Sequence, residues 1–179
     1  AVQARPSLTW RLLFLSSGEI SLAAHMAEGG KRSRAGQETR MADIPADAGM
    51  GMGLFEDMHE LAGGDALARQ LTKTCEVQYG TAGRAWQEYL VQNTDTLRER
   101  VQAPAERFTA SWIPEGATGQ IHRVARRFAV VAAAGEIATA AGITGWPEGE
   151  AACSAKACFQ AWLAERGGVG NIEETRMLQ

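Results

Sequence analysis

The stretch from Gln120 to Ala141 constrains the fold of this chain more than any other feature. Apolar side chains recur along it at helical spacing and form a broad stripe made of Ile121, Val124, Ala125, Phe128, Ala129, Val131 and Ala132. This pattern predicts an amphipathic helix that buries one wide face against other elements. Gly142 supplies a usual stop for such a helix. The chain is therefore expected to have a helical core.

Other segments extend this helical pattern. We expect a helix that begins at Asp65, a second over 82–97, and a last long one from Pro147 to Gly167. Between them, Pro104 and Pro114 predict a less regular stretch that contains Phe108 and Trp112. Residues 65–179 are thus predicted to form a helical, bundle-like domain of four to five helices.

Residues 1–64 have a different pattern. The apolar run within Leu8–Ser16 predicts a buried strand, and Thr39–Ile44 is the one other strand candidate. Because two strands make a poor sheet, their partners are expected from missing sequence or from a second chain. Short helices are predicted over 18–28, with a cap from Ser16 or Ser17, and over Leu54–Leu61. The predicted fold class is mainly α, with a short β-containing section before the helical domain.

Composition narrows the class of protein. The chain has 179 residues, a net charge of −3 and three cysteines without a CxxC pair. These values exclude a disordered or collagen-like chain and disfavour both a disulfide framework and a protein that coats nucleic acid, so the cytoplasm is the expected location. The apolar run near the start is too short to span a bilayer, and no membrane partner is expected. Because the first residue is Ala, we expect the sequence to be a piece of a longer protein.

Basic residues gather in two places. Lys31, Arg32, Arg34 and Arg40 lie within one polar loop, and Arg123, Arg126 and Arg127 share the outer face of the 120–141 helix. The planar guanidinium fork forms paired hydrogen bonds with phosphate oxygens, so both clusters are candidates for nucleotide or nucleic-acid binding. The alternative is that each cluster is solvated surface, which stays open.

Two serines and three histidines are further candidates for a functional site. Ser16 and Ser17 follow the predicted strand, where ligands gather in open α/β sheets, but a plain helix cap fits them equally well. The three histidines, His25, His59 and His122, lie on different elements and lack ligands at metal-binding spacing. No metal site is predicted.

Several motifs together resemble the later part of the "domain of unknown function 927" family. The matching segments are spread over nearly the whole chain: 10–19, 36–40, 43–47, 79–83, 126–129, 134–136, 145–147, 162–163 and 166–168. The most specific are Trp10-Arg11-Leu12-Leu13-Phe14-Leu15-Ser16-Ser17-Gly18-Glu19 and Gly145-Trp146-Pro147.

This resemblance implies a parent protein that is a P-loop ATPase of phages and other mobile elements, helicase-like and often beside primase modules. Residues 1–64 would then be the end of a RecA/AAA-like nucleotide-binding module, and residues 65–179 its helical C-terminal domain. Ser16 or Ser17 would match the polar sensor position, and Arg40 would be the candidate arginine finger. ATP and Mg²⁺ are implied for the parent, which is expected to be a homo-oligomer with DNA as a candidate partner.

The phosphate loop and the acidic magnesium-binding strand of that family are missing from this sequence. We therefore expect the chain alone to be inactive as an ATPase. Two functions from different classes remain open. One is the C-terminal part of an ATP-dependent DNA helicase, and the other is a helical module that binds nucleic acid or protein and has no catalytic role.

Overall fold

The computed structural model describes residues 9, 12–33 and 35–170. Contacts divide the chain into two compact units, 1–33 and 34–179, whereas the sequence suggested a division after residue 64. The first unit contains helix α1 (Leu22–Glu28). The second contains the remaining described helices: α2 (Ala35–Glu38), α3 (Gly64–Val77), α4 (Thr81–Gln92), α5 (Thr94–Trp112), α6 (Gly119–Ala140) and α7 (Glu150–Glu165). The mainly helical class is confirmed.

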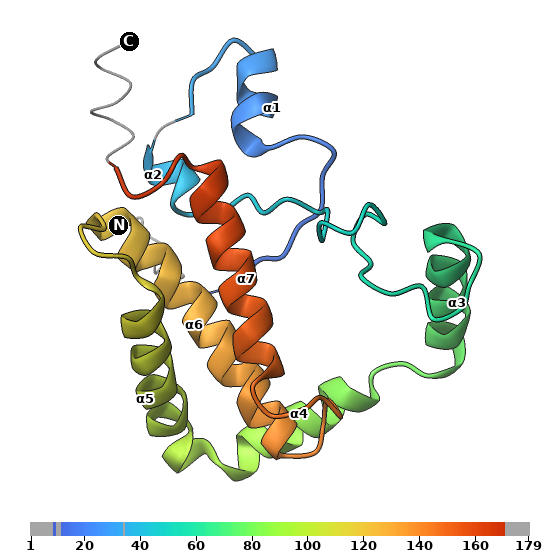
Figure 1. Cartoon of the computed structure of the whole chain (residues 1–179). Helices are drawn as coiled ribbons and strands as arrows, with labels where there is room; N and C mark the ends of the chain where they lie inside the picture. Colours follow the sequence, from blue (N-terminus) through green and yellow to red (C-terminus); the bar gives the residue numbers. More distant parts are fainter. Residues whose placement is uncertain (1–8, 10–11, 34, 171–179) are drawn as a thin grey trace, which may run out of the picture. The chain divides into compact units, whose positions relative to one another are not determined.

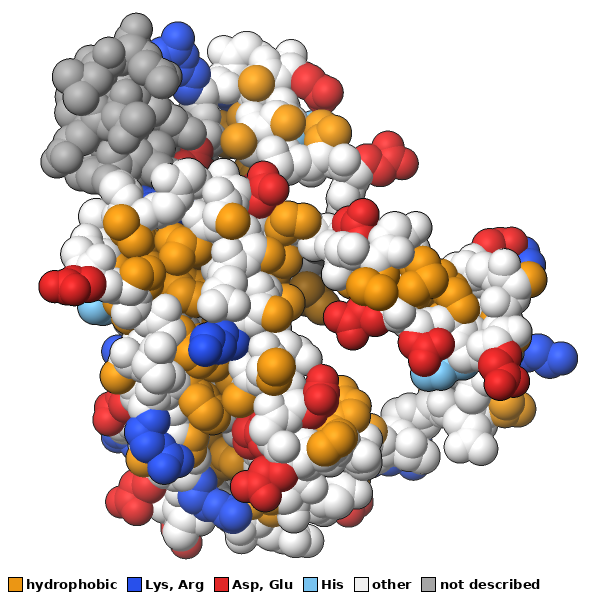
Figure 2. All heavy atoms as spheres, viewed as in Figure 1, with side chains coloured by type: hydrophobic (Ala, Val, Ile, Leu, Met, Phe, Trp, Pro, Cys, Tyr) orange, Lys and Arg blue, Asp and Glu red, His pale blue; other side chains and the backbone are white. Residues whose placement is uncertain are grey.

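Helices α5, α6 and α7 lie side by side and form what we call the three-helix body (Figure 1). Short connections join successive helices, which therefore run antiparallel. The apolar stripe predicted for 120–141 is buried here, because α6 packs against both α5 and α7. In the space-filling view, hydrophobic side chains run along this body between charged groups at its margins (Figure 2).

An aromatic cluster fills the centre of the three-helix body. Phe159 on α7 is fully buried and lies within 6.5 Å, between ring centroids, of Trp112, Phe128 and Trp162. Phe108 stacks on Trp112 at 5.5 Å. Rings at such separations add favourable quadrupole contacts to the burial of their large apolar surfaces. Because α5, α6 and α7 all contribute rings to this cluster, it holds the three helices together.

Small residues bring α6 and α7 into close contact. A Cβ built on Gly135 would lie 2.5 Å from the Cβ of Ala151, closer than real atoms approach. Glu136 stands next in sequence, and its carboxylate accepts hydrogen bonds from the backbone N–H groups of Gly149 and Ala152, both at 2.9 Å. Two donors at the start of α7 are thereby satisfied by a side chain from α6.

The predicted end of α6 is confirmed. Gly142 adopts a left-handed backbone, with φ of +72°, and its N–H donates to the Thr139 carbonyl at 2.9 Å. The N–H of Ile143 reaches the Ala138 carbonyl, also at 2.9 Å. This pair of bonds is a Schellman motif, which glycine permits because it has no Cβ to clash in this conformation.

Three local predictions were wrong. The single helix predicted over 82–97 is divided at Asn93, because α4 ends at Gln92 and α5 begins at Thr94, and the Asn93 side chain donates to the Tyr89 carbonyl at 2.8 Å. Residues 104–112 are not irregular, because α5 continues through Pro104 to Trp112. Proline removes one backbone hydrogen bond and clashes with the preceding turn, but Phe108 and Trp112 gain burial only if the helix continues. The helix predicted over 54–61 is absent, and turns occupy this stretch. Phe55 and Met58 instead lie against Gly64 at the start of α3.

The predicted β-containing section is not seen in the described residues. Residues 12–18 are irregular, and Leu15 is 99% exposed. Residues 39–44 form a turn and an irregular stretch. A strand needs a neighbour to receive its backbone hydrogen bonds, and neither segment has one here. Ser16 and Ser17 therefore follow no strand and cap no helix, since the side chain of Ser21 caps α1 through the Ala24 N–H at 3.1 Å.

Candidate functional site

The arginines of α6 do not all face solvent. Arg123 and Arg126 are exposed, whereas Arg127 is half-buried. Val124 and Ala125 lie between Arg123 and Arg126 in sequence, are buried, and hold this part of α6 against the three-helix body. Because α6 is fixed on both sides, the exposed pair projects from a rigid backbone.

Arg127 binds a distant part of the chain. Its guanidinium donates a hydrogen bond to the backbone carbonyl of Thr39. Thr39 is only 6% exposed, and Ala42 packs against the hydrophobic core. These two contacts hold residues 39–42, which we call the anchored segment, on the helical unit. Arg127 is one of the predicted phosphate-binding residues, and this hydrogen bond engages one of its donors with a backbone carbonyl.

Arg40 belongs to the anchored segment and is exposed. The N–H groups of Arg40 and Met41 both donate to the Gln37 carbonyl at 2.9 Å, so a closed turn carries this side chain. Arg40 directly follows Thr39, whose carbonyl accepts the hydrogen bond from Arg127 on α6, and α6 also carries Arg123 and Arg126. We call Arg40, Arg123 and Arg126 the arginine surface. No described acidic side chain forms an ion pair with any of the three.

A second arginine joins helix ends and was not singled out from the sequence. Arg166 donates to the Gln120 side chain at 2.6 Å and to the carbonyls of Gly168 and Gly170 at 3.1 and 3.0 Å. Its guanidinium also lies 5.7 Å from the centre of the Trp162 ring. Burial lowers the pKa of Arg166, and the nearby Glu38 carboxylate opposes this shift. The interactions give Arg166 a structural role at the start of α6.

The remaining predicted site residues lie in the compact unit formed by residues 1–33 or outside the described residues. Ser16, Ser17, Lys31 and Arg32 are exposed in irregular segments of residues 12–33. Arg34 lies outside the described residues. The loop and the helical arginines were predicted as two separate clusters. The structure links Arg40 from the first with the second, and this link had no signal in the sequence.

The described residues provide neither a metal site nor a helix that could span a membrane. In the described part of the chain, no three His, Cys, Asp or Glu side chains gather in a way that could hold a metal ion. His25 and His59 each have one acidic neighbour, Glu28 and Asp57, with both nitrogen–oxygen distances at 3.9 Å. None of the described helices is both long enough and apolar enough to cross a membrane.

Comparisons with protein-family models, with curated proteins and with solved structures found no match for this chain. The resemblance to the "domain of unknown function 927" family has no support from them and rests on its sequence motifs alone.

Proposed function

We propose that the helical unit binds the phosphate groups of DNA through Arg40, Arg123 and Arg126. The observation that carries this proposal is the contact between Arg127 and Thr39, which fixes the residue before Arg40 on α6, the helix that carries the exposed Arg123 and Arg126. Guanidinium groups form paired, charge-assisted hydrogen bonds with phosphate oxygens. Three of them on a rigid support suit neighbouring phosphates of one backbone.

The charge of the whole chain limits the size of this interface. With a net charge of −3, the protein repels DNA outside its basic surface, so only a few phosphates are neutralised. Each neutralised phosphate contributes about −0.9 to the slope of log affinity against log salt concentration for duplex DNA. A surface of three arginines therefore gives a slope of about −3. Contacts to phosphates alone carry no base readout, so affinity is expected to be independent of DNA sequence.

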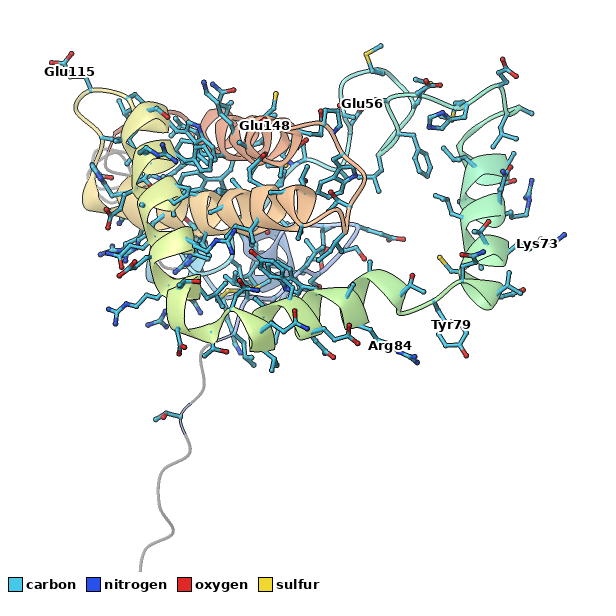
Figure 3. All side chains as sticks on the ribbon, turned by 90° about the horizontal axis from the view of Figure 1, so that it is seen from below. Glu56, Lys73, Tyr79, Arg84, Glu115 and Glu148 are labelled. Atoms are coloured by element: carbon cyan, nitrogen blue, oxygen red, sulfur yellow. The ribbon has the colours of Figure 1, made fainter. Side chains whose placement is uncertain are left out.

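The test is fluorescence anisotropy with a labelled duplex over a salt series. Arg40→Ala and Arg123→Ala should each weaken binding about fivefold, which corresponds to about 1 kcal/mol. The matched control is Arg84→Ala, because Arg84 on α4 is also exposed and points away from the helices (Figure 3). Its loss should leave affinity unchanged. Equal losses in all three variants would point to diffuse attraction and contradict a defined surface.

A second function is an arginine finger in an oligomeric P-loop ATPase, as the family resemblance implies. It is favoured by the way Arg40 is presented, since its own side chain is exposed while the neighbouring Thr39 is buried and bonded. A finger needs a fixed backbone and a guanidinium that can reach a phosphoryl group held by another subunit.

The described residues do not themselves fit ATP and Mg²⁺. They form no cluster of carboxylates for the metal, and the sequence has no phosphate loop. No step of hydrolysis is therefore assigned to this unit. In the parent ATPase, Arg40→Ala should reduce hydrolysis about a thousandfold and leave ATP binding nearly intact. Hydrolysis near the normal rate would remove Arg40 from this role.

A further inference from the structure

Arg127 is placed differently from the other arginines of α6. Its side chain is half-buried and donates to the Thr39 carbonyl, whereas Arg123 and Arg126 are exposed. A guanidinium engaged with a backbone carbonyl offers fewer donors to an external phosphate. The positively charged group of Arg127 is thus engaged in a contact within the helical unit, with a segment that is far away in sequence.

The anchored segment is in contact with the helical unit on both sides of Arg40. Thr39 precedes Arg40 and is bonded to Arg127, and Ala42 follows two positions later and packs on the core. The bonds from Arg40 and Met41 to the Gln37 carbonyl close the turn between these contacts. The position of Arg40 along α6 therefore depends on whether this segment is docked.

We infer that Arg127 is a positioning residue that docks the 39–42 segment on α6 and thereby completes the arginine surface. This inference rests on the proposed function, and it adds a means of control. Undocking the segment removes Arg40 from the surface without altering Arg123 or Arg126.

Docking can be measured without DNA. Trypsin cleaves after arginine, and the bond between Arg40 and Met41 lies between the two contact points. We expect Arg127→Ala to speed cleavage at this bond at least tenfold, as followed by mass spectrometry. Arg127→Gln keeps an amide donor and should have an intermediate effect. Cleavage after Lys31 and Arg32 serves as the internal control, because both are exposed in irregular chain and should be cut equally fast in every variant.

DNA binding then tests the consequence of docking. Arg127→Ala should weaken DNA binding as much as Arg40→Ala does. The variant that combines both substitutions should bind DNA no more weakly than either single variant. Independent phosphate contacts would instead give losses that multiply. Melting temperature and circular dichroism check that each variant keeps the three-helix body.

Ala42→Lys separates positioning from charge. It disturbs the second contact point but adds a positive charge to the segment. Positioning predicts weaker DNA binding and faster cleavage after Arg40, whereas simple attraction predicts tighter binding.

The outcomes distinguish the two proposals. Unchanged cleavage after Arg40 in Arg127→Ala would overturn the role of Arg127, whatever its DNA affinity. Faster cleavage in a protein that binds no duplex at any salt concentration would leave the docking contact standing and overturn the phosphate surface. Faster cleavage with unchanged DNA affinity would show that docking does not serve Arg40.

Discussion

Helices α6 and α4 both carry apolar side chains along one face, but only α6 buries them. Eight residues of α6 are buried, whereas α4 has none. The difference lies in their neighbours, because α6 packs between α5 and α7 while α4 makes only slight contact with α5. Trp86 and Tyr89 of α4 stack on each other, with ring centroids 5.8 Å apart, and stay half-buried. An apolar face therefore stabilises this fold only where a second helix covers it.

The largest test of this comparison is Phe159→Ala. Phe159 is fully buried at the centre of the aromatic cluster, so its truncation leaves a cavity and should cost about 3–5 kcal/mol of unfolding free energy. Urea denaturation measures this loss. Val91→Ala on α4, where the side chain is 76% exposed, should change stability by less than about 0.5 kcal/mol. Similar losses at both sites would mean that α4 is also part of the stable core.

Replacing glycine by alanine should change the free energy of unfolding in opposite directions in α6 and α4. At Gly135 the added methyl meets Ala151, so Gly135→Ala should destabilise by about 1–3 kcal/mol. Adding Ala151→Gly should restore part of the loss. At Gly83 in α4 nothing lies within 4 Å of the added Cβ, so Gly83→Ala should stabilise by about 0.5–1 kcal/mol. Thermal or urea unfolding decides the sign, and a stabilised Gly135→Ala would contradict close packing of α6 on α7.

The smallest expected effect concerns Glu136. Glu136→Ala leaves the N–H groups of Gly149 and Ala152 without their carboxylate and should cost about 1 kcal/mol. Glu136→Gln keeps one acceptor oxygen and should cost less. Glu88→Ala, at an exposed position of α4, provides the control and should be near neutral. If Glu136→Ala matches this control, the start of α7 does not depend on α6.

The helices of the three-helix body were largely predictable, because apolar residues at helical spacing and glycine stops are local signals in the sequence. The apolar stripe over 120–141 and the stop at Gly142 fixed α6 almost to the residue. The course of α5 was not predictable, since Pro104 is unfavourable in isolation and only tertiary burial of Phe108 and Trp112 outweighs it. The strand expected over Leu8–Ser16 depends on partners that its own residues do not specify, and its first part lies outside the described residues.

The candidate site was predictable only in its parts. Arg40, Arg123 and Arg126 were identified from residue type, because guanidinium chemistry is visible in sequence. The contact between their segments was not, since its acceptor is the backbone carbonyl of Thr39, and every residue carries such a group. The structural role of Arg127 was hidden for the same reason.

The contact between Arg127 and Thr39 also has a consequence for biosynthesis. The two residues are 88 positions apart, and a ribosome adds about 5–20 residues per second, so roughly 4–18 s separate their appearance. During this interval the nascent segment around Thr39 has no α6 on which to dock. Helices with local contacts form within microseconds, whereas closure of so long a loop must await its distant partner. The turn that carries Arg40 is therefore made early but cannot reach its place until α6 has been synthesised.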